Sequence, residues 1–138
     1  MSDLLYYYND LILMRAPGTI FIYEGDNDIA VDKRPSEILQ TARELTARIM
    51  NDLPGARVIF ISPKPSIARC DLAPMYRRLN RRLARYCESQ PNLEFADVWE
   101  VMLDKDGVVL QDIFLEDGLH MNNKGYDLWA AILREYLE

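Results

Sequence analysis

The chain contains a single histidine, His120, and an aspartate stands three residues before it at Asp117. On a tight turn, a carboxylate at this spacing can fold back onto the ring Nδ1, which fixes the tautomer and leaves Nε2 to take a proton from a nucleophile. Any histidine-based acid/base chemistry must therefore use His120. The same spacing also arises in ordinary surface turns, so a helix-capping histidine is the alternative interpretation of the pair alone.

A second polar segment, Gly25-Asp26-Asn27-Asp28, directly follows a run of β-branched and aromatic residues. Glycine permits a sharp turn out of a strand, and the Asn27 amide is a neutral donor suited to a developing oxyanion. Glycine, aspartate and asparagine are also common in purely structural turns. Two alternate carboxylates without further ligands are a poor cation site, so no metal is predicted.

Charge and cysteine content argue against a nucleic-acid-binding protein and against a disulfide-rich one. The 138 residues include 22 Asp and Glu against 16 Lys and Arg, and this net charge of −6 disfavours nucleic acid as a partner. Cys70 and Cys87 fit neither a disulfide framework nor a metal-ligand spacing and indicate reduced, partly buried thiols. No apolar run approaches the roughly 18 residues that span a bilayer. We expect a cytoplasmic protein with one domain over residues 1–138, no cofactor, no membrane contact and a small-molecule partner.

Helical periodicity alternates along the chain with short apolar runs, which is typical of a parallel sheet with helices between its strands. Strands are predicted at residues 19–24, 57–62 and 93–96. Helices are predicted at 35–53, from 71 or 74 to 90, and from 123 or 124 to 137, with a buried helix at 3–15. The pattern predicts an α/β fold, a three-layer α/β/α sandwich, in which loops at the C-terminal ends of the strands carry the chemistry.

Three segments resemble the SGNH (GDSL-type) hydrolase family in the same order, and together they cover nearly the whole chain. They are FIYEGDNDIA at 21–30, FISPKPS at 60–66 and DGLHMNNKGY at 117–126. The resemblance implies a flavodoxin-like parallel sheet. It also implies that Asp117 orients His120, the general base and then acid, and that Asn27 is an oxyanion-hole donor.

The loops around this set are expected to bind substrate through Gly25, Asp28 and Ser66. Family members begin with a strand ending in Gly-Asp-Ser, whose serine is the nucleophile, followed by a block II glycine that gives another oxyanion donor. Residues 2–8 resemble the helix after that glycine, so both blocks are expected upstream of Met1 and the first strands are expected to be missing. Ser2 is the nearest candidate for a substitute nucleophile.

Two functions fit this pattern. One is a carboxylic ester hydrolase that acts on a small-molecule ester and is impaired by the absence of the serine block. The other is a non-catalytic remnant of the fold that serves as an oligomerisation or interaction module. Without the first strands, strand 19–24 has an open edge, which predicts a homo-oligomer that buries this edge or the tyrosine-rich N-terminal helix. The arginine-rich helix around 77–85 is predicted to be a solvated face that pairs with neighbouring acids.

Overall fold

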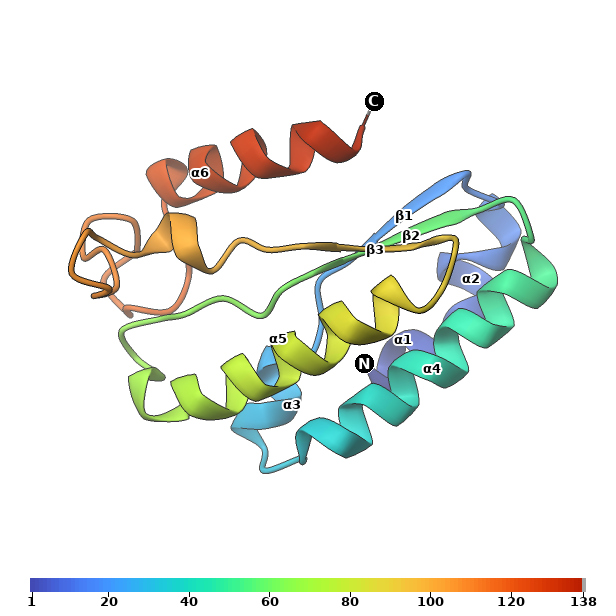
Figure 1. The fold of residues 1–138 in the computed structure, drawn as a ribbon, viewed down its shortest axis with the longest axis horizontal. Coiled ribbons are helices and arrows are strands. Elements are labelled where there is room, and N and C mark those ends of the chain that lie inside the picture. The colour runs from blue at the N-terminus through green and yellow to red at the C-terminus, as the bar shows by residue number, and fades with distance from the viewer. Residues whose placement is uncertain (138) are drawn as a thin grey trace.

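The computed structural model describes residues 1–137 and confirms the α/β class. Three parallel strands form one sheet in the order β1 (Thr19–Ile22), β2 (Arg57–Ile61) and β3 (Leu93–Ala96). The long helices are α4 (Pro35–Asp52), α5 (Ala73–Glu88) and α6 (Asn123–Leu133). Helices α4 and α5 cover one face of the sheet and α6 covers the other, which gives the expected three layers (Figure 1).

The central strand β2 is the most buried part of the sheet. Phe60 pairs with Ile22 of β1 on one side and with Phe95 of β3 on the other. A strand covered by helices on both faces must be apolar along its whole length, and Val58, Ile59 and Phe60 have almost no exposed surface. Strand β1 pairs only with β2 among the described residues, so its outer edge has no strand partner, as expected.

The core has two parts, one on each face of the sheet. On the α4 and α5 side, Ile38 and Leu45 of α4 pack with Leu79 and Leu83 of α5, and all four are buried. Their spacing of seven residues in α4 and four in α5 places them on one side of each helix, as the sequence predicted. The second part lies under α6 around Trp129. In residues 1–137, no helix is both long enough and apolar enough to cross a membrane.

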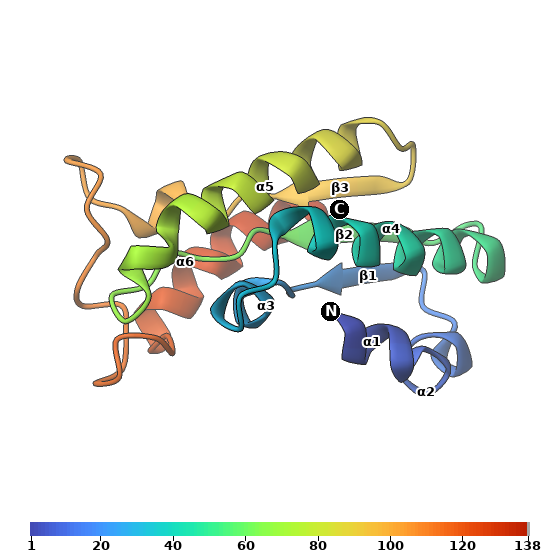
Figure 2. The same cartoon turned by 90° about the horizontal axis from the view of Figure 1, so that it is seen from below.

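The predicted continuous buried helix at 3–15 is wrong. The segment instead forms α1 (Ser2–Tyr6), α2 (Tyr8–Leu11) and a 3-10 turn (Leu13–Arg15), which lie beside α4 and next to β1 (Figure 2). Side chains of Tyr6 and Met14 are 81% and 78% exposed, whereas Tyr8 and Ile12 are buried. A helix that is apolar all round needs cover on every side, and here α4 supplies cover on one side only.

Short elements connect the long ones and carry the polar loops. Helix α3 (Asp26–Ala30) follows β1, a 3-10 turn (Cys70–Leu72) leads into α5, and another (Glu100–Met102) follows β3. The last helix is shorter than predicted, because α6 ends at Leu133 and the chain continues as a 3-10 turn (Arg134–Tyr136). The loops after β1 and β2 leave the C-terminal ends of parallel strands, the edge of the sheet where sites are expected.

Candidate active site

A pocket of about 280 Å³ lies where the loop after β1, the loop after β2 and the loop before α6 meet. Its polar lining consists of Glu24, Asp26, Asn27, Lys64 and His120. Its apolar lining consists of Tyr23, Leu119, Met121, Tyr126 and Trp129. The fold therefore brings Asn27 and His120, which are far apart in the sequence, to one cavity.

Asp117 and His120 form the contact that their spacing predicts. The Asp117 Oδ2 atom lies 2.5 Å from Nδ1 of His120, and its Oδ1 accepts hydrogen bonds of 2.9 Å from the backbone N–H groups of Leu119 and His120. The side-chain bond to His120, followed by the two backbone bonds, lowers the pKa of the Asp117 carboxyl to about 2. Since Nδ1 is engaged, Nε2 is left for chemistry, and it bonds no other group in residues 1–137.

The loop after β2 holds the histidine turn in place. The Gly118 carbonyl oxygen accepts hydrogen bonds of 3.0 Å from the backbone N–H groups of both Ile67 and Ala68. Lys64 Nζ donates a 2.7 Å bond to the Leu119 carbonyl oxygen. The lysine is buried, and this burial lowers the pKa of its ammonium. These bonds fix the turn that carries His120 relative to the sheet.

Asn27 lies in the first turn of α3 and is held by an arginine from the loop after β2. Arg69 Nη1 donates a 3.1 Å hydrogen bond to Asn27 Oδ1 and lies 4.0 Å from Asp26 Oδ2. Asp26 Oδ2 also accepts a 2.9 Å bond from the Tyr23 hydroxyl, whose pKa is raised mainly by burial. Because the guanidinium occupies Oδ1, the amide nitrogen Nδ2 of Asn27 remains the free donor.

The two other predicted residues of the β1 loop have structural contacts. Gly25 adopts a positive φ of 112° and is the N-cap residue directly before α3, as expected for a sharp turn out of the strand. Asp28 is buried outside the pocket and accepts hydrogen bonds from Lys33 Nζ (2.6 Å) and from the Met1 ammonium (2.8 Å). Burial opposes ionisation of Asp28, but these bonds keep its pKa below the ordinary value.

The predicted serines do not line the pocket either. Ser66 is buried, and its Oγ accepts a 3.2 Å bond from the backbone N–H of Arg69, so it shapes the loop that carries this arginine. Ser2 Oγ accepts a 3.2 Å bond from Lys33 Nζ, and no contact of Ser2 brings it to His120. Cys87 is buried and Cys70 is exposed, and both lie outside the pocket.

Lys64 and Arg69, which support the His120 turn and Asn27, were not predicted from the sequence. A signal was present, because both are basic residues in a loop that directly follows the most apolar strand. Their partners lie at Leu119 and Asn27 in other loops, so nothing local in the sequence connects them.

The model of the GDSL-like lipase/acylhydrolase family matches residues 3–128. The chain belongs to this family. No curated protein matches the chain. Asp117, His120 and Asn27 all lie within the residues that match this family of lipases and acylhydrolases.

Solved structures resemble the chain over nearly its whole length. A candidate platelet activating factor from Streptococcus pneumonia is 22% identical with a TM-score of 0.87, covering 99% of this chain and 67% of that one. A candidate acylhydrolase from Bacteroides fragilis is 18% identical with a TM-score of 0.85, covering 99% and 68%. A GDSL-like lipase from Bacteroides thetaiotaomicron is 17% identical with a TM-score of 0.78, covering 99% and 69%. At these identities the likeness shows a shared fold.

Proposed function

We propose that the chain is a carboxylic ester hydrolase that uses the Asp117–His120 pair as its acid/base and Asn27 as its oxyanion donor. The observation that supports this most strongly is that Asn27 and His120 line the same pocket, each held by a partner that frees one polar atom. That atom is the acceptor Nε2 in His120 and the donor Nδ2 in Asn27. Acyl transfer needs a proton acceptor beside the attacking nucleophile and a hydrogen-bond donor beside the carbonyl oxygen.

In the proposed reaction, His120 Nε2 removes a proton from the nucleophile as it attacks the ester carbonyl carbon. The carbonyl oxygen becomes an oxyanion that accepts a hydrogen bond from Asn27 Nδ2. Asp117 stabilises the imidazolium that forms. His120 then returns the proton to the leaving alkoxide as the ester C–O bond breaks, and the products of attack by water are a carboxylic acid and an alcohol.

The rate of the proposed hydrolysis depends on which group attacks the ester carbonyl. None of the residues that line the pocket is a serine, threonine or cysteine. We therefore propose that water attacks directly in this chain and that hydrolysis is slow, since an oxyanion hole and binding without the full triad retain only a small part of the rate.

The substrate is proposed to be an ester with a short acyl group. The pocket volume of about 280 Å³ is just below the roughly 300–1,000 Å³ that is usual for small-molecule sites. Its apolar wall is rigid, because the Tyr23 and Trp129 rings pack edge to face with centroids 4.9 Å apart. An acetyl or butyryl group fits such a wall better than a long chain.

Hydrolysis of p-nitrophenyl acetate and butyrate by the purified chain tests this proposal beside a heat-denatured control. We expect slow turnover above the control that disappears in His120→Ala and survives in Ser2→Ala. Loss in Ser2→Ala would instead identify Ser2 as the nucleophile. A rate no better than the heat-denatured control would make the chain a non-catalytic member of the family, for which a role in oligomerisation or binding remains.

We also propose that the chain forms a homo-oligomer. The outer edge of β1 is open, and the adjacent segment exposes Tyr6, Tyr7, Leu11 and Met14. Open strand edges and clustered apolar side chains favour pairing with another surface. A second copy of the chain offers the same edge and the same apolar side chains.

A further inference from the structure

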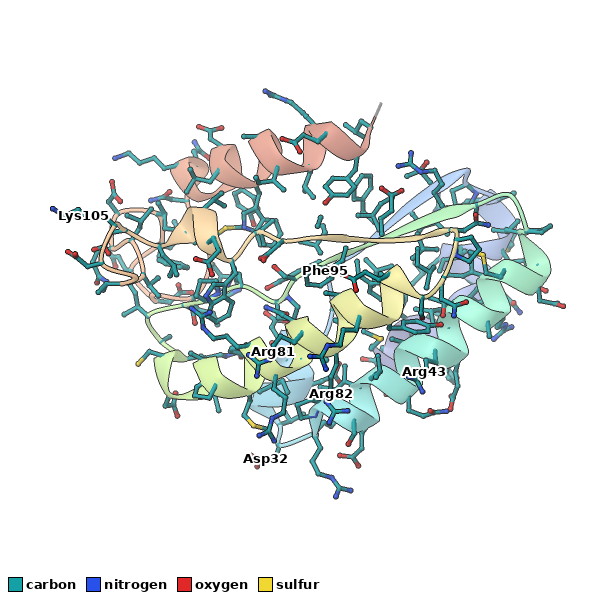
Figure 3. All side chains as sticks on the ribbon, in the orientation of Figure 1. Asp32, Arg43, Arg81, Arg82, Phe95 and Lys105 are labelled. Atoms are coloured by element: carbon teal, nitrogen blue, oxygen red, sulfur yellow. The ribbon has the colours of Figure 1, made fainter. Side chains whose placement is uncertain are left out.

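A groove of about 580 Å³ lies between α4 and α5 and shares no lining residue with the active-site pocket. Five guanidinium groups line it, from Arg43, Arg78, Arg81, Arg82 and Arg85. Figure 3 shows Arg81 and Arg82 extending from α5 and Arg43 from α4 on the same face of the molecule. In a chain with a net charge of −6, this is a strong local concentration of positive charge.

For the four groove arginines of α5, the predicted pairing with neighbouring acids is wrong. None of the five lies within 4.0 Å of a carboxylate in the part of the chain that the structure describes. Only Arg77, outside the groove, follows the prediction, with Glu100 3.7 Å away and the Trp99 ring 4.8 Å from its guanidinium carbon. The α4 side of the groove consists of Leu39 and Arg43, so it offers these arginines no carboxylate.

Contacts between α4 and α5 hold the side chains of the groove in place. Arg43 lies over the Tyr86 ring, 5.4 Å from its centroid, and the Tyr86 hydroxyl is 2.7 Å from Thr46 Oγ1. Thr46 is buried in α4, so this bond ties the α5 side of the groove to the α4 side. The cation–π contact and the hydroxyl bond hold Arg43 toward the arginines of α5.

The arrangement is unfavourable without a counter-charge. Arg78, Arg82 and Arg85 follow the i, i+4, i+7 spacing that places side chains on one face of a helix, where like charges destabilise it. A bound anion removes this repulsion. The planar guanidinium group also matches the oxygen geometry of phosphate with paired hydrogen bonds, and a phosphate group carries more negative charge than a carboxylate, so phosphate suits a cluster of several arginines.

We propose that this groove binds a small soluble polyanion that carries two or more phosphate groups. Arg85 follows Arg78 by seven positions, which is about 10 Å along a helix, so one phosphate reaches only part of the cluster. The groove volume lies within the range of small-molecule sites. A long polyanion extends beyond the groove over a surface whose charge is negative overall, and this repulsion favours a compact ligand.

Isothermal titration calorimetry of the chain with tripolyphosphate at low ionic strength tests the proposal. The groove variant Arg78→Gln/Arg82→Gln is compared with Arg15→Gln/Arg134→Gln, which removes the same charge from exposed positions outside the groove. We expect the groove variant to bind tripolyphosphate about tenfold or more weakly and the control variant to bind within about twofold of the parent. Orthophosphate is expected to bind the parent about tenfold more weakly than tripolyphosphate.

Three results would overturn the proposal. Equal losses in the two variants would show a general charge effect, and equal affinities for orthophosphate and tripolyphosphate would remove the requirement for several phosphates. Sedimentation with phosphatidylserine vesicles, without binding of tripolyphosphate, would assign the arginines to a lipid surface. Circular dichroism checks that both variants keep the parent helix content, which is expected because the substituted side chains are exposed.

Discussion

Asp117 owes its acidity to hydrogen bonds and not to burial, since its side chain is 47% exposed. We predict that ¹³C NMR detects its carboxyl titrating near pH 2, below the ordinary value of 3.8. Because the pKa is lower in the folded chain, its contribution to stability is complete above the unfolded value and is lost as the pH falls toward 2. In His120→Ala the midpoint is expected to rise, because the bond to the histidine is the largest cause of the shift. An unchanged midpoint would assign the shift to the backbone bonds alone.

Arg69 is a positioning residue in the proposed reaction, because it acts through Asn27. With Oδ1 no longer bound in Arg69→Gln, the Asn27 amide is free to rotate its donor away from the pocket. We predict that kcat for p-nitrophenyl acetate falls about tenfold with little change in KM, as is usual for loss of a supporting partner. Asn27→Ala is expected to cost about 10²-fold or more. Arg77→Gln is the matched control, and an equal loss there would contradict the positioning role.

The turn from β1 into α3 depends on glycine at position 25. A Cβ there would lie 2.9 Å from Leu79 Cδ2 and 3.6 Å from Ile38 Cγ2, in a backbone with φ of 112°. We predict that Gly25→Ala lowers the free energy of unfolding, measured in urea, by about 1–3 kcal/mol. Gly55→Ala is the control, because no atom lies within 4 Å of its added Cβ. Similar values for the two variants would show that the turn tolerates a side chain.

Among the elements, regular helices and strands were the easiest to predict. Strand β3 has the predicted bounds, and α4 begins at the predicted Pro35, because a proline start and a clear apolar stripe are local signals. The N-terminal segment has apolar residues on every side and so gives no direction for packing. Its helices break at Tyr7 and Ile12, a result that depends on how little of the segment α4 covers.

At the scale of the whole molecule, the open β1 edge and the exposed N-terminal side chains predict self-association. Sedimentation velocity of the purified chain is expected to show a homo-oligomer, which the variant Tyr6→Glu/Met14→Glu dissociates by placing charge on the apolar surface. The control Val108→Glu/Leu137→Glu changes exposed apolar residues elsewhere and is expected to leave the oligomer intact. A parent chain that sediments as a monomer at all concentrations would disprove the assembly.

The α/β class, the parallel strands and the Asp117–His120 contact could be predicted from the residues alone. The spacing of apolar residues in helices and strands, and a contact across a turn of three or four residues, depend only on residues that are close in the sequence. The folded chain was needed to see that Asn27 shares a pocket with His120 and that Lys64 and Arg69 hold these loops. The same is true of the five arginines that meet without acids. These contacts join residues that are distant in the chain, and their geometry follows from how the helices pack on the sheet, which no local pattern encodes.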